Sequence, residues 1–347
     1  MPDTDHEIAT KRHVVDRLRW QALADPFYGT LMNRLADDIV SDGEGWRPFR
    51  SLAAVPLSHN LPLRVVGAAH RMALRGEAPA YAAHLPSCGG DGEAEAAWPA
   101  FLDLATSGAL DAAAQSAVQT NEPARTTSLL PGFGVVAAET GLPLRLLEVG
   151  SSAGLLLQLD RYHHTLGRDT WGPDDSPVRL RSRGTAPLPP LLIAERRGCD
   201  PNPLDPVVDR TLLLSFVWPT ALERFERLDA ALRVAEAHPV TVDRASAAPW
   251  LRGQLADPVP GRATVVFHSV VWQYLDADEQ AEAAGAILAA GRRATAAAPL
   301  AWLRLEPHTD PERGTELRLT TWPDGVDRVL ALCDYHGRWL RWGTGAR

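Results

Sequence analysis

The sequence lacks the patterns that mark a metal centre, a membrane span or a disulfide framework. It contains no H-E-x-x-H, C-x-x-C or P-loop motif, so we expect no catalytic metal. No apolar run reaches the roughly 18 residues that a membrane-spanning helix needs. The chain has three cysteines, which are far apart: Cys88, Cys199 and Cys333. With no signal-peptide pattern, this cysteine usage predicts a cytoplasmic protein without a membrane partner.

An excess of positive charge is also missing. The chain has 35 Lys and Arg against 43 Asp and Glu, a formal net charge of −8. This balance disfavours binding to bulk nucleic acid through its phosphates, although it allows a local basic pocket. What the chain does have is 45% hydrophobic and 22% charged residues, which is typical of a globular protein with a sizeable core. The oligomeric state leaves no signature in the sequence.

The most informative segment runs from Leu144 to Asp160. A short apolar run ends at Glu148, a turn with Gly150 and Gly154 follows, and an apolar-periodic segment begins at once. This order predicts a strand, a tight loop and a helix over about residues 153–166. Gly150 permits backbone angles that other residues avoid, and Gly154 lets the helix start close to the sheet or to a ligand. The loop therefore predicts a ligand at the carboxyl end of a strand.

Three interpretations of this loop stay open from its residues alone. The E-x-G-x-x-x-G pattern of a nucleotide-type site uses Glu148 as a hydrogen-bond acceptor. The overlapping G-x-S-x-G pattern makes Ser152 the nucleophile of a serine hydrolase. In the third interpretation, Ser151 or Ser152 merely caps the helix. The order of elements disfavours the hydrolase, because no strand precedes the one at residues 144–149 and no HGGG-like segment occurs.

The organisation of the chain changes near residue 140. The first 140 residues have helical spacing without an alternating strand, and strand-like and helical segments alternate afterwards. The expected later strands are residues 144–149, 240–243, 263–268, 300–305, 316–321 and 338–342, with a strand pair at 178–183 and 191–197; the expected helices include 221–237 and 278–292. Such alternation predicts an α/β fold with a mostly parallel sheet and an antiparallel edge. We expect a helical cap over 1–140 and a sheet domain over 141–347.

The glycine loop after the first strand, and the two final strands at an antiparallel edge, resemble the Rossmann-like, seven-stranded sheet of class I methyltransferases, which use S-adenosylmethionine. The chain also resembles DUF2332, a family of uncharacterised bacterial proteins. The segments that carry this resemblance are Gln119–Arg125, Glu148–Gly154, Gly198–Asp205, Phe216–Pro219, His268–Tyr274 and His336–Trp339. The resemblance implies an S-adenosylmethionine-binding fold and names no substrate.

The methyltransferase resemblance implies a cofactor site around the loop. Residues Gly150 to Gly154, including Ser151 and Ser152, would pass under the cofactor's amino-acid tail, with the first helical N–H groups meeting its carboxylate. Glu148 would accept a hydrogen bond from the cofactor's ammonium group. An acid at the end of the second strand would take the ribose hydroxyls, and another after the next strand would flank the adenine; these are Asp200 and Asp243.

The spacing of Asp200 leaves its role open. It follows Gly154 by 46 residues, so an insertion of about residues 168–190 must loop out. Asp169 has the simpler spacing but follows no strand. Asp200 can also simply start the turn before Pro201.

Substrate groups are expected from two further segments. His268, at the end of a later strand, would accept the substrate's proton with Glu122 as a second catalytic group. Asn121, Arg125 and Ser269 would bind substrate. In the alternative, Asn121 caps a helix and Glu122 pairs with an arginine. The predicted function is methyl transfer to an O or N atom of a small molecule; the alternatives are a non-catalytic cofactor-binding protein of the same fold or a Ser152 hydrolase.

Overall fold

The computed structural model describes residues 5–343. The chain forms two compact units, one drawn from residues 1–120 and 209–229, the other from 121–208 and 230–347. The boundary expected at residue 140 does not coincide with this division. Helix α8 (Arg125–Thr140) belongs to the second unit, because its apolar residues pack on the sheet with Leu303 and Leu305. None of the described helices is both long and apolar enough to cross a membrane.

The first unit is built from helices. They are α1 (Asp5–Gln21), α2 (Pro26–Val40), α3 (Arg47–Arg50), α4 (Leu61–Leu74), α5 (Pro79–Ala82), α6 (Ala94–Ser107), α7 (Leu110–Ala113) and α9 (Arg210–Ser215). Helix α2 begins at Pro26 because Asp25 accepts the N–H of Tyr28 at 2.8 Å and Pro26 takes the first helical position. Among residues 5–143 no strand occurs, which confirms the sequence-based prediction.

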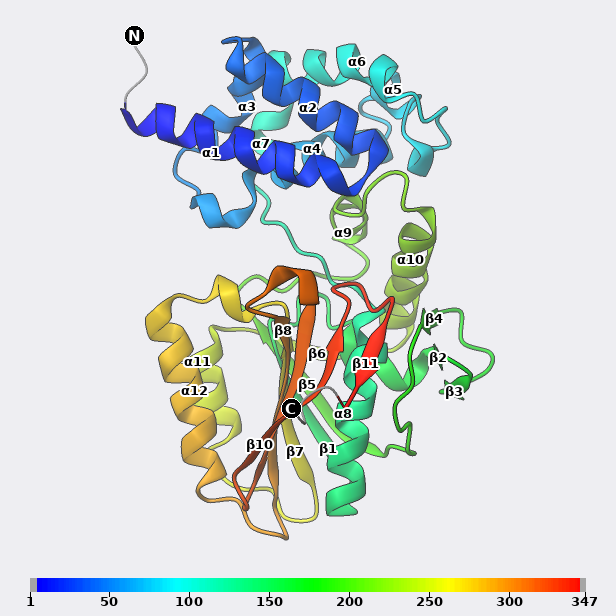
Figure 1. Cartoon of the computed structure of the whole chain (residues 1–347), viewed down its shortest axis with the longest axis vertical. Helices are drawn as coiled ribbons and strands as arrows, with labels where there is room; N and C mark the ends of the chain where they lie inside the picture. The colour runs from blue at the N-terminus through cyan, green and yellow to red at the C-terminus, as the bar shows by residue number, and fades with distance from the viewer. Residues whose placement is uncertain (1–4, 344–347) are drawn as a thin grey trace. The chain divides into compact units, whose positions relative to one another are not determined.

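The second unit has an α/β fold around an eight-stranded mixed sheet (Figure 1). The strands lie in the order β11 (Leu340–Trp342), β10 (Val326–Cys333), β9 (Thr315–Trp322), β8 (Leu300–Pro307), β7 (Ala263–Ser269), β1 (Leu144–Val149), β5 (Ile193–Asp200) and β6 (Thr241–Arg244). From β8 to β6 all neighbours are parallel, and from β8 to β11 all are antiparallel. Helix α8 covers one face, and α11 (Ala247–Gln254) with α12 (Ala277–Gly291) covers the other.

The structure corrects the expected seven-stranded, methyltransferase-type sheet. Strand β10 was missed because its first residues are exposed and only its last four are buried, which gives no alternating pattern. The strand expected at residues 178–183 exists as β4 (Arg179–Ser182), but it pairs with β2 (His163–Leu166) in a separate sheet that also holds β3 (Asp169–Trp171). Helix α10 (Leu222–Ala237) and α12 agree with the predicted helices.

The helix expected after the glycine loop is absent. A 3₁₀ helix, η5 (Leu156–Arg161), takes its first part, and strand β2 takes its end. The sequence of β2 and the residue before it, Tyr-His-His-Thr, is rich in aromatic and β-branched residues that favour strands over helices. Gly167, at a φ of 62°, then closes the turn to β3.

The strand order determines where a ligand can bind. From β1 the chain moves outward to β5 and β6, and then returns to β7 on the other side of β1. The loops that leave β1 and β7 therefore run in opposite directions, and a crevice between such loops is the usual ligand site of parallel α/β sheets. Val149 is in register with both Cys199 and His268, so β1, β5 and β7 end together at this edge.

Candidate functional site

Strained backbone marks the ends of the two strands at this crevice. Ser152, in the loop after β1, has a φ of 51°, and Val270, directly after β7, has a φ of 54°. A positive φ is uncommon for any residue with a Cβ and exceptional for a β-branched one. Such strain costs about 1–3 kcal/mol per residue and is concentrated at functional sites. The two loops are therefore the first place to look for a function.

The loop after β7 makes the close approach that the sequence predicts at Gly150. A Cβ on Gly150 would lie 2.3 Å from Cγ2 of Val271, and one on Gly154 would lie 2.6 Å from Cγ2 of Val240. Both glycines also have a positive φ, of 73° and 71°. Packing and backbone angle are thus sufficient to explain why glycine occupies these two positions.

The amide groups of the glycine loop are bound within the protein. The N–H groups of Gly150 and Ser151 both donate to the carbonyl oxygen of Cys199, at 2.9 and 3.0 Å. Leu155 donates its N–H to Oδ1 of Asn121 at 3.1 Å. Because η5 replaces the expected helix, the helical N–H groups predicted to meet a cofactor's carboxylate are not supplied here. The predicted helix is therefore wrong, and the contact of loop N–H groups with a cofactor stays a prediction.

Asp200 ends β5 and lies against the loop. Its Oδ2 accepts the N–H of Ser152 at 2.9 Å, and its Oδ1 accepts the N–H of Asn202 at 2.8 Å. Burial raises the pKa of the carboxyl, and these backbone donors act against that rise. A carboxylate has about four acceptor positions, so two backbone donors leave room for hydroxyl donors of a ligand. The small sheet of β2, β3 and β4 fills the insertion before β5, and Asp169 lies within it.

Glu148 is the buried acid of the site. It is 1% exposed, and among the described residues its Oε2 has no hydrogen-bond partner. Burial raises the pKa of this carboxyl well above its ordinary range, while the hydroxyl of Ser151 and the charge of Arg125 oppose the rise. Within the described chain, Oγ of Ser269 at the end of β7 is also buried without a partner. Unpaired buried polar atoms are rare in folded proteins, and a bound ligand or an ordered water often supplies their partner.

The segment before α8 joins both loops. Asn121 donates its Nδ2 to the carbonyl oxygen of Ser151 at 2.7 Å. Arg125 donates to the carbonyl oxygens of Ser269 and Tyr335, at 3.3 and 3.0 Å. Glu122 accepts the N–H of Ala124 through Oε1 at 3.2 Å. The structure therefore brings Asn121 and Arg125 to the glycine loop and to Ser269, about 140 positions away in the chain.

The imidazole of His268 points to the other face of the sheet. Successive strand residues alternate in direction; Phe267 packs edge-on against Phe133 of α8, and Val266 packs in the core under α11 and α12. His268 therefore faces α11 and α12, whereas Glu148 faces α8 with Phe267. The expected convergence of the imidazole with the segment before α8 does not occur in this arrangement.

His268 has a carboxylate partner that the sequence did not reveal. Its Nδ1 lies 2.5 Å from Oε1 of Glu306, near the end of β8, and its ring stacks on Trp272 with centroids 4.6 Å apart. The same Oε1 accepts the N–H of Val271 at 3.2 Å. An acid one residue after a predicted strand, beside a strand that ends in histidine, was the signal available in the sequence.

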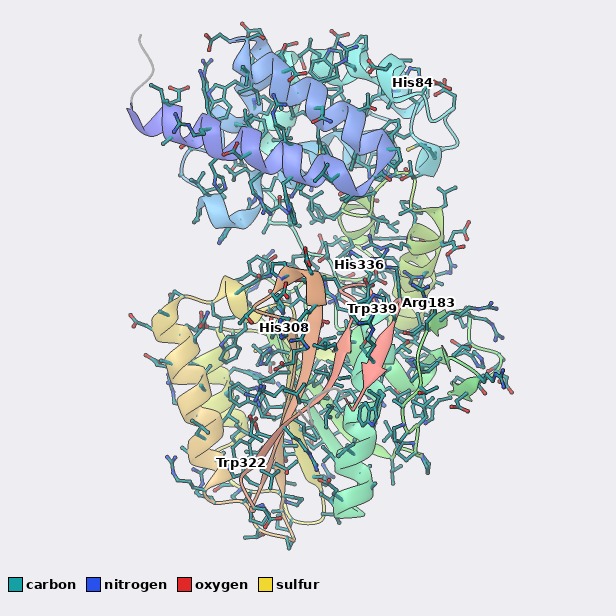
Figure 2. All side chains as sticks on the ribbon, in the orientation of Figure 1. His84, Arg183, His308, Trp322, His336 and Trp339 are labelled. Atoms are coloured by element: carbon teal, nitrogen blue, oxygen red, sulfur yellow. The ribbon has the colours of Figure 1, made fainter. Side chains whose placement is uncertain are left out.

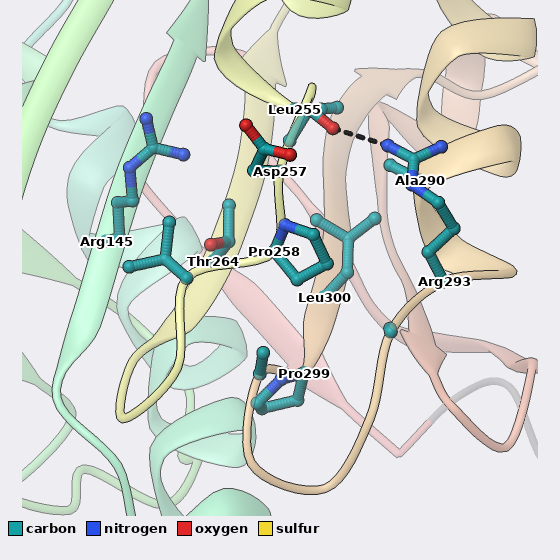
Figure 3. Close-up of a pocket in the computed structure, with 12 residues that line it drawn as sticks. Arg145, Leu255, Asp257, Pro258, Thr264, Ala290, Arg293, Pro299 and Leu300 are labelled. Atoms are coloured by element: carbon teal, nitrogen blue, oxygen red, sulfur yellow. Dashed lines mark hydrogen bonds between the residues drawn. The ribbon is translucent and has the colours of Figure 1, made fainter.

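These side chains line a pocket of about 440 Å³ at the carboxyl ends of β7 and β8. Its lining residues are His268, Trp272, Trp302, Arg304, Glu306, Pro307, His308, Thr309, Glu316 and Arg318. A second hollow, shown in Figure 3, lies at the opposite edge of the sheet between Arg145 and Arg293. Its volume of about 20 Å³ holds roughly one water molecule. Of the two, the first is large enough for a small-molecule ligand.

The comparison with family models agrees with the resemblance seen in the sequence. A model described as "uncharacterized protein conserved in bacteria (DUF2332)" matches residues 15–342. The chain belongs to the DUF2332 family. No curated protein and no solved structure matches it.

Several segments that resemble DUF2332 meet at this edge of the sheet. Asp334 accepts the N–H groups of His336 and Arg338, at 2.9 and 3.1 Å, which shapes the turn between β10 and β11. A Cβ on Gly337 in this turn would lie 2.2 Å from the carbonyl oxygen of Ala124. The turn therefore packs directly on the segment that holds the glycine loop.

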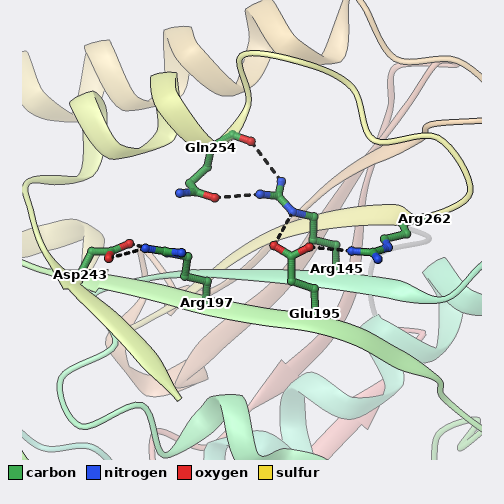
Figure 4. Close-up of polar contacts among 6 residues, drawn as sticks. All are labelled: Arg145, Glu195, Arg197, Asp243, Gln254 and Arg262. Atoms are coloured by element: carbon green, nitrogen blue, oxygen red, sulfur yellow. Dashed lines mark hydrogen bonds and ion pairs between the residues drawn. The ribbon is translucent and has the colours of Figure 1, made fainter. Parts of the chain in front are cut away.

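Asp243, expected to flank an adenine, lies near the end of β6 in register with Cys199, and its carboxylate is held by two other side chains. Its carboxylate forms a bidentate pair with Arg197, at 2.6 and 2.7 Å (Figure 4). Its Oδ2 also accepts a hydrogen bond from Nε1 of Trp250 at 2.7 Å. The hydrogen bond from Arg197 is the main reason that the pKa of Asp243 is lowered. This geometry gives Asp243 a structural role that joins β5, β6 and α11.

Proposed function

We propose that this DUF2332 protein is an S-adenosylmethionine-dependent methyltransferase that acts on an O or N atom of a small molecule. The observation that carries the proposal is the position of Asp200. It ends the strand next to β1, and it binds the backbone of the glycine loop at the point where the strand order reverses. A ribose-binding acid occupies this position in Rossmann-like dinucleotide sites. The parallel strands β6-β5-β1-β7-β8 follow the order of that fold.

The residues at the crevice fit such a cofactor in part. Asp200 has acceptor capacity for the two ribose hydroxyls, and Oε2 of Glu148 would accept the methionine ammonium. Arg125, which donates to the carbonyl oxygens of Ser269 and Tyr335, would meet the cofactor's carboxylate in place of the loop amides. Because Val271 packs on Gly150, a ligand over this glycine also requires the loop after β7 to move.

Methyl transfer requires little catalytic chemistry from the protein's own side chains. The cofactor, when bound, supplies a methyl group on an activated sulfonium, so orientation matters more than a strong catalytic group. His268 is suited to take the acceptor's proton. Glu306 binds its Nδ1, which fixes the ring and leaves Nε2 to act as the base. The acceptor would then lie in the pocket beside His268. Because His268 faces α11 and α12 whereas Glu148 faces α8, acceptor and cofactor would meet across the carboxyl ends of β1 and β7.

One observation favours the serine hydrolase as a second candidate. The positive φ of Ser152 is what a nucleophile elbow requires. Against it, Ser152 is 5% exposed, and the loop leads into a 3₁₀ helix where the elbow leads into an α-helix. A non-catalytic cofactor-binding protein is the alternative with the same fold.

A matched pair of variants tests the role of Asp200. Asp200→Asn should lower the affinity for S-adenosylhomocysteine at least tenfold in a calorimetric titration. Asp205→Asn is the control, because Asp205 also accepts two backbone N–H groups, at 2.8 and 2.9 Å, but is exposed in the following turn. Equal affinities for the two variants would contradict the proposal.

A further inference from the structure

The pocket beside His268 is lined by charges that lie in two rows. His268, Arg304 and Arg318 are in register on β7, β8 and β9, and two residues further along β8 Glu306 is in register with Glu316. All five are on the face covered by α11 and α12, because the residues between them pack on α8. A basic row and an acidic row therefore cross the pocket about 6.6 Å apart, the length of two strand residues.

Polar atoms in these rows are buried without partners. Among residues 5–343, Nε1 of Trp302, Nε of Arg304 and Oε2 of Glu306 form no hydrogen bond, and neither does Nε2 of His268. The first two are N–H donors and the third is an acceptor. Leaving such an atom unpaired in the protein interior is unfavourable, so a ligand that pairs it gains binding energy. The pocket thus offers two donors toward its basic row and one carboxylate oxygen in its acidic row.

Other N–H groups of the two arginines have partners within the fold. Arg304 donates Nη2 to Oγ1 of Thr320 at 2.6 Å and to Asp327, and its guanidinium lies 4.4 Å from the ring centroid of Trp302. Arg318 is paired with Glu316 and Asp327. The arginines are therefore held in place within the fold, and their arrangement does not depend on a ligand.

We propose that this pocket binds a small zwitterion of the amino-acid class. Its carboxylate would accept from Nε1 of Trp302 and Nε of Arg304, and its ammonium would donate to Oε2 of Glu306. An anion without an amine would be repelled by the acidic row, and a cation without a carboxylate would be repelled by the basic row. A volume of about 440 Å³ is in the range of small-molecule sites.

Binding of the zwitterion is independent of methyl transfer, but its role as methyl acceptor rests on the proposed function. In that role the amine is the acceptor nitrogen, and Nε2 of His268 takes its proton. Binding to the pocket is measured on the full chain without S-adenosylmethionine. A protein that binds S-adenosylhomocysteine but no amino acid would refute the pocket assignment and leave the cofactor assignment standing.

The experiment is a thermal-shift screen of the twenty common amino acids, followed by calorimetry. At least one should raise the melting temperature, and its decarboxylated amine and its deaminated acid should each bind at least tenfold more weakly. Trp302→Phe removes the indole N–H but keeps a ring, and Glu306→Gln removes the charge; each should weaken binding by about tenfold or more, which is about 1.4 kcal/mol.

The matched control is Trp322→Phe. Trp322 lies at the opposite end of the sheet (Figure 2), in register with Leu300 at the start of β8. This variant should bind like the wild type. The proposal is overturned if no amino acid binds, if the amine or the acid alone binds as tightly as the zwitterion, or if a folded Trp302→Phe protein keeps full affinity. Folding of each variant is checked by its melting temperature without ligand.

Discussion

Replacing Asn121 tests whether this side chain holds the glycine loop in place. Asn121 is 6% exposed and makes two hydrogen bonds to the loop, one to the carbonyl oxygen of Ser151 and one from the N–H of Leu155. In Asn121→Ala the Ser151 oxygen still accepts the N–H of Gly154 at 2.7 Å, so only a hydrogen bond worth about 1 kcal/mol is lost there. The N–H of Leu155 is left unpaired in the core, which costs about 1–3 kcal/mol more.

We therefore expect Asn121→Ala to lower the free energy of unfolding by about 2–4 kcal/mol. The assay is urea unfolding followed by circular dichroism, together with hydrogen exchange of the Leu155 amide, which should become much faster. Asn33→Ala, at an exposed position of α2, is the control and should change stability by no more than about 0.5 kcal/mol. A loss below about 0.5 kcal/mol in Asn121→Ala, with unchanged exchange at Leu155, would refute the reasoning.

Three further outcomes follow from the same loops. Because burial raises the pKa of Glu148 above its ordinary 4.5, its contribution to stability is largest below pH 4.5 and is lost as pH rises through the folded-state value. Stability curves of the wild type and Glu148→Gln should therefore diverge above pH 4.5, to the variant's advantage; parallel curves would contradict this. Gly150→Ala should destabilise the protein through its φ of 73° and the contact with Val271, and Val271→Ala should restore part of the loss; no restoration in the double variant would refute the contact. A fluorophosphonate probe should leave Ser152 unlabelled, with Ser152→Ala as the control; stoichiometric attachment to Ser152 would establish the hydrolase instead.

The sequence predicted the elements whose signals are local. Three local patterns predicted the α/β fold: the apolar run before Glu148, the glycines after it, and the alternation of later strands and helices. Strand β10 was missed because half of it is exposed, and the helix expected after Gly154 was wrong because the residues of β2 favour a strand. These errors arise where packing in the folded chain decides between two local preferences.

The candidate site divides in the same way. Asp200 was chosen because it ends a predicted strand and precedes Pro201, and the structure places it beside the loop. The face on which His268 lies was not readable, because it depends on the register of β7 with β1. The alternation of Trp302, Arg304 and Glu306 was visible as every second residue of one strand. That these residues form two charged rows was not visible, since the other residues of the rows lie on β7 and β9.

The measurement that tests the cofactor assignment most directly is a calorimetric titration of the full-length wild type. S-adenosylmethionine and S-adenosylhomocysteine are titrated separately. NAD is the comparison ligand, because dinucleotide-binding folds have the same strand order. The account predicts saturable binding of both S-adenosyl compounds at one site per chain, and no heat of binding with NAD. Absence of binding by both S-adenosyl compounds, or saturable binding of NAD in their place, would contradict it.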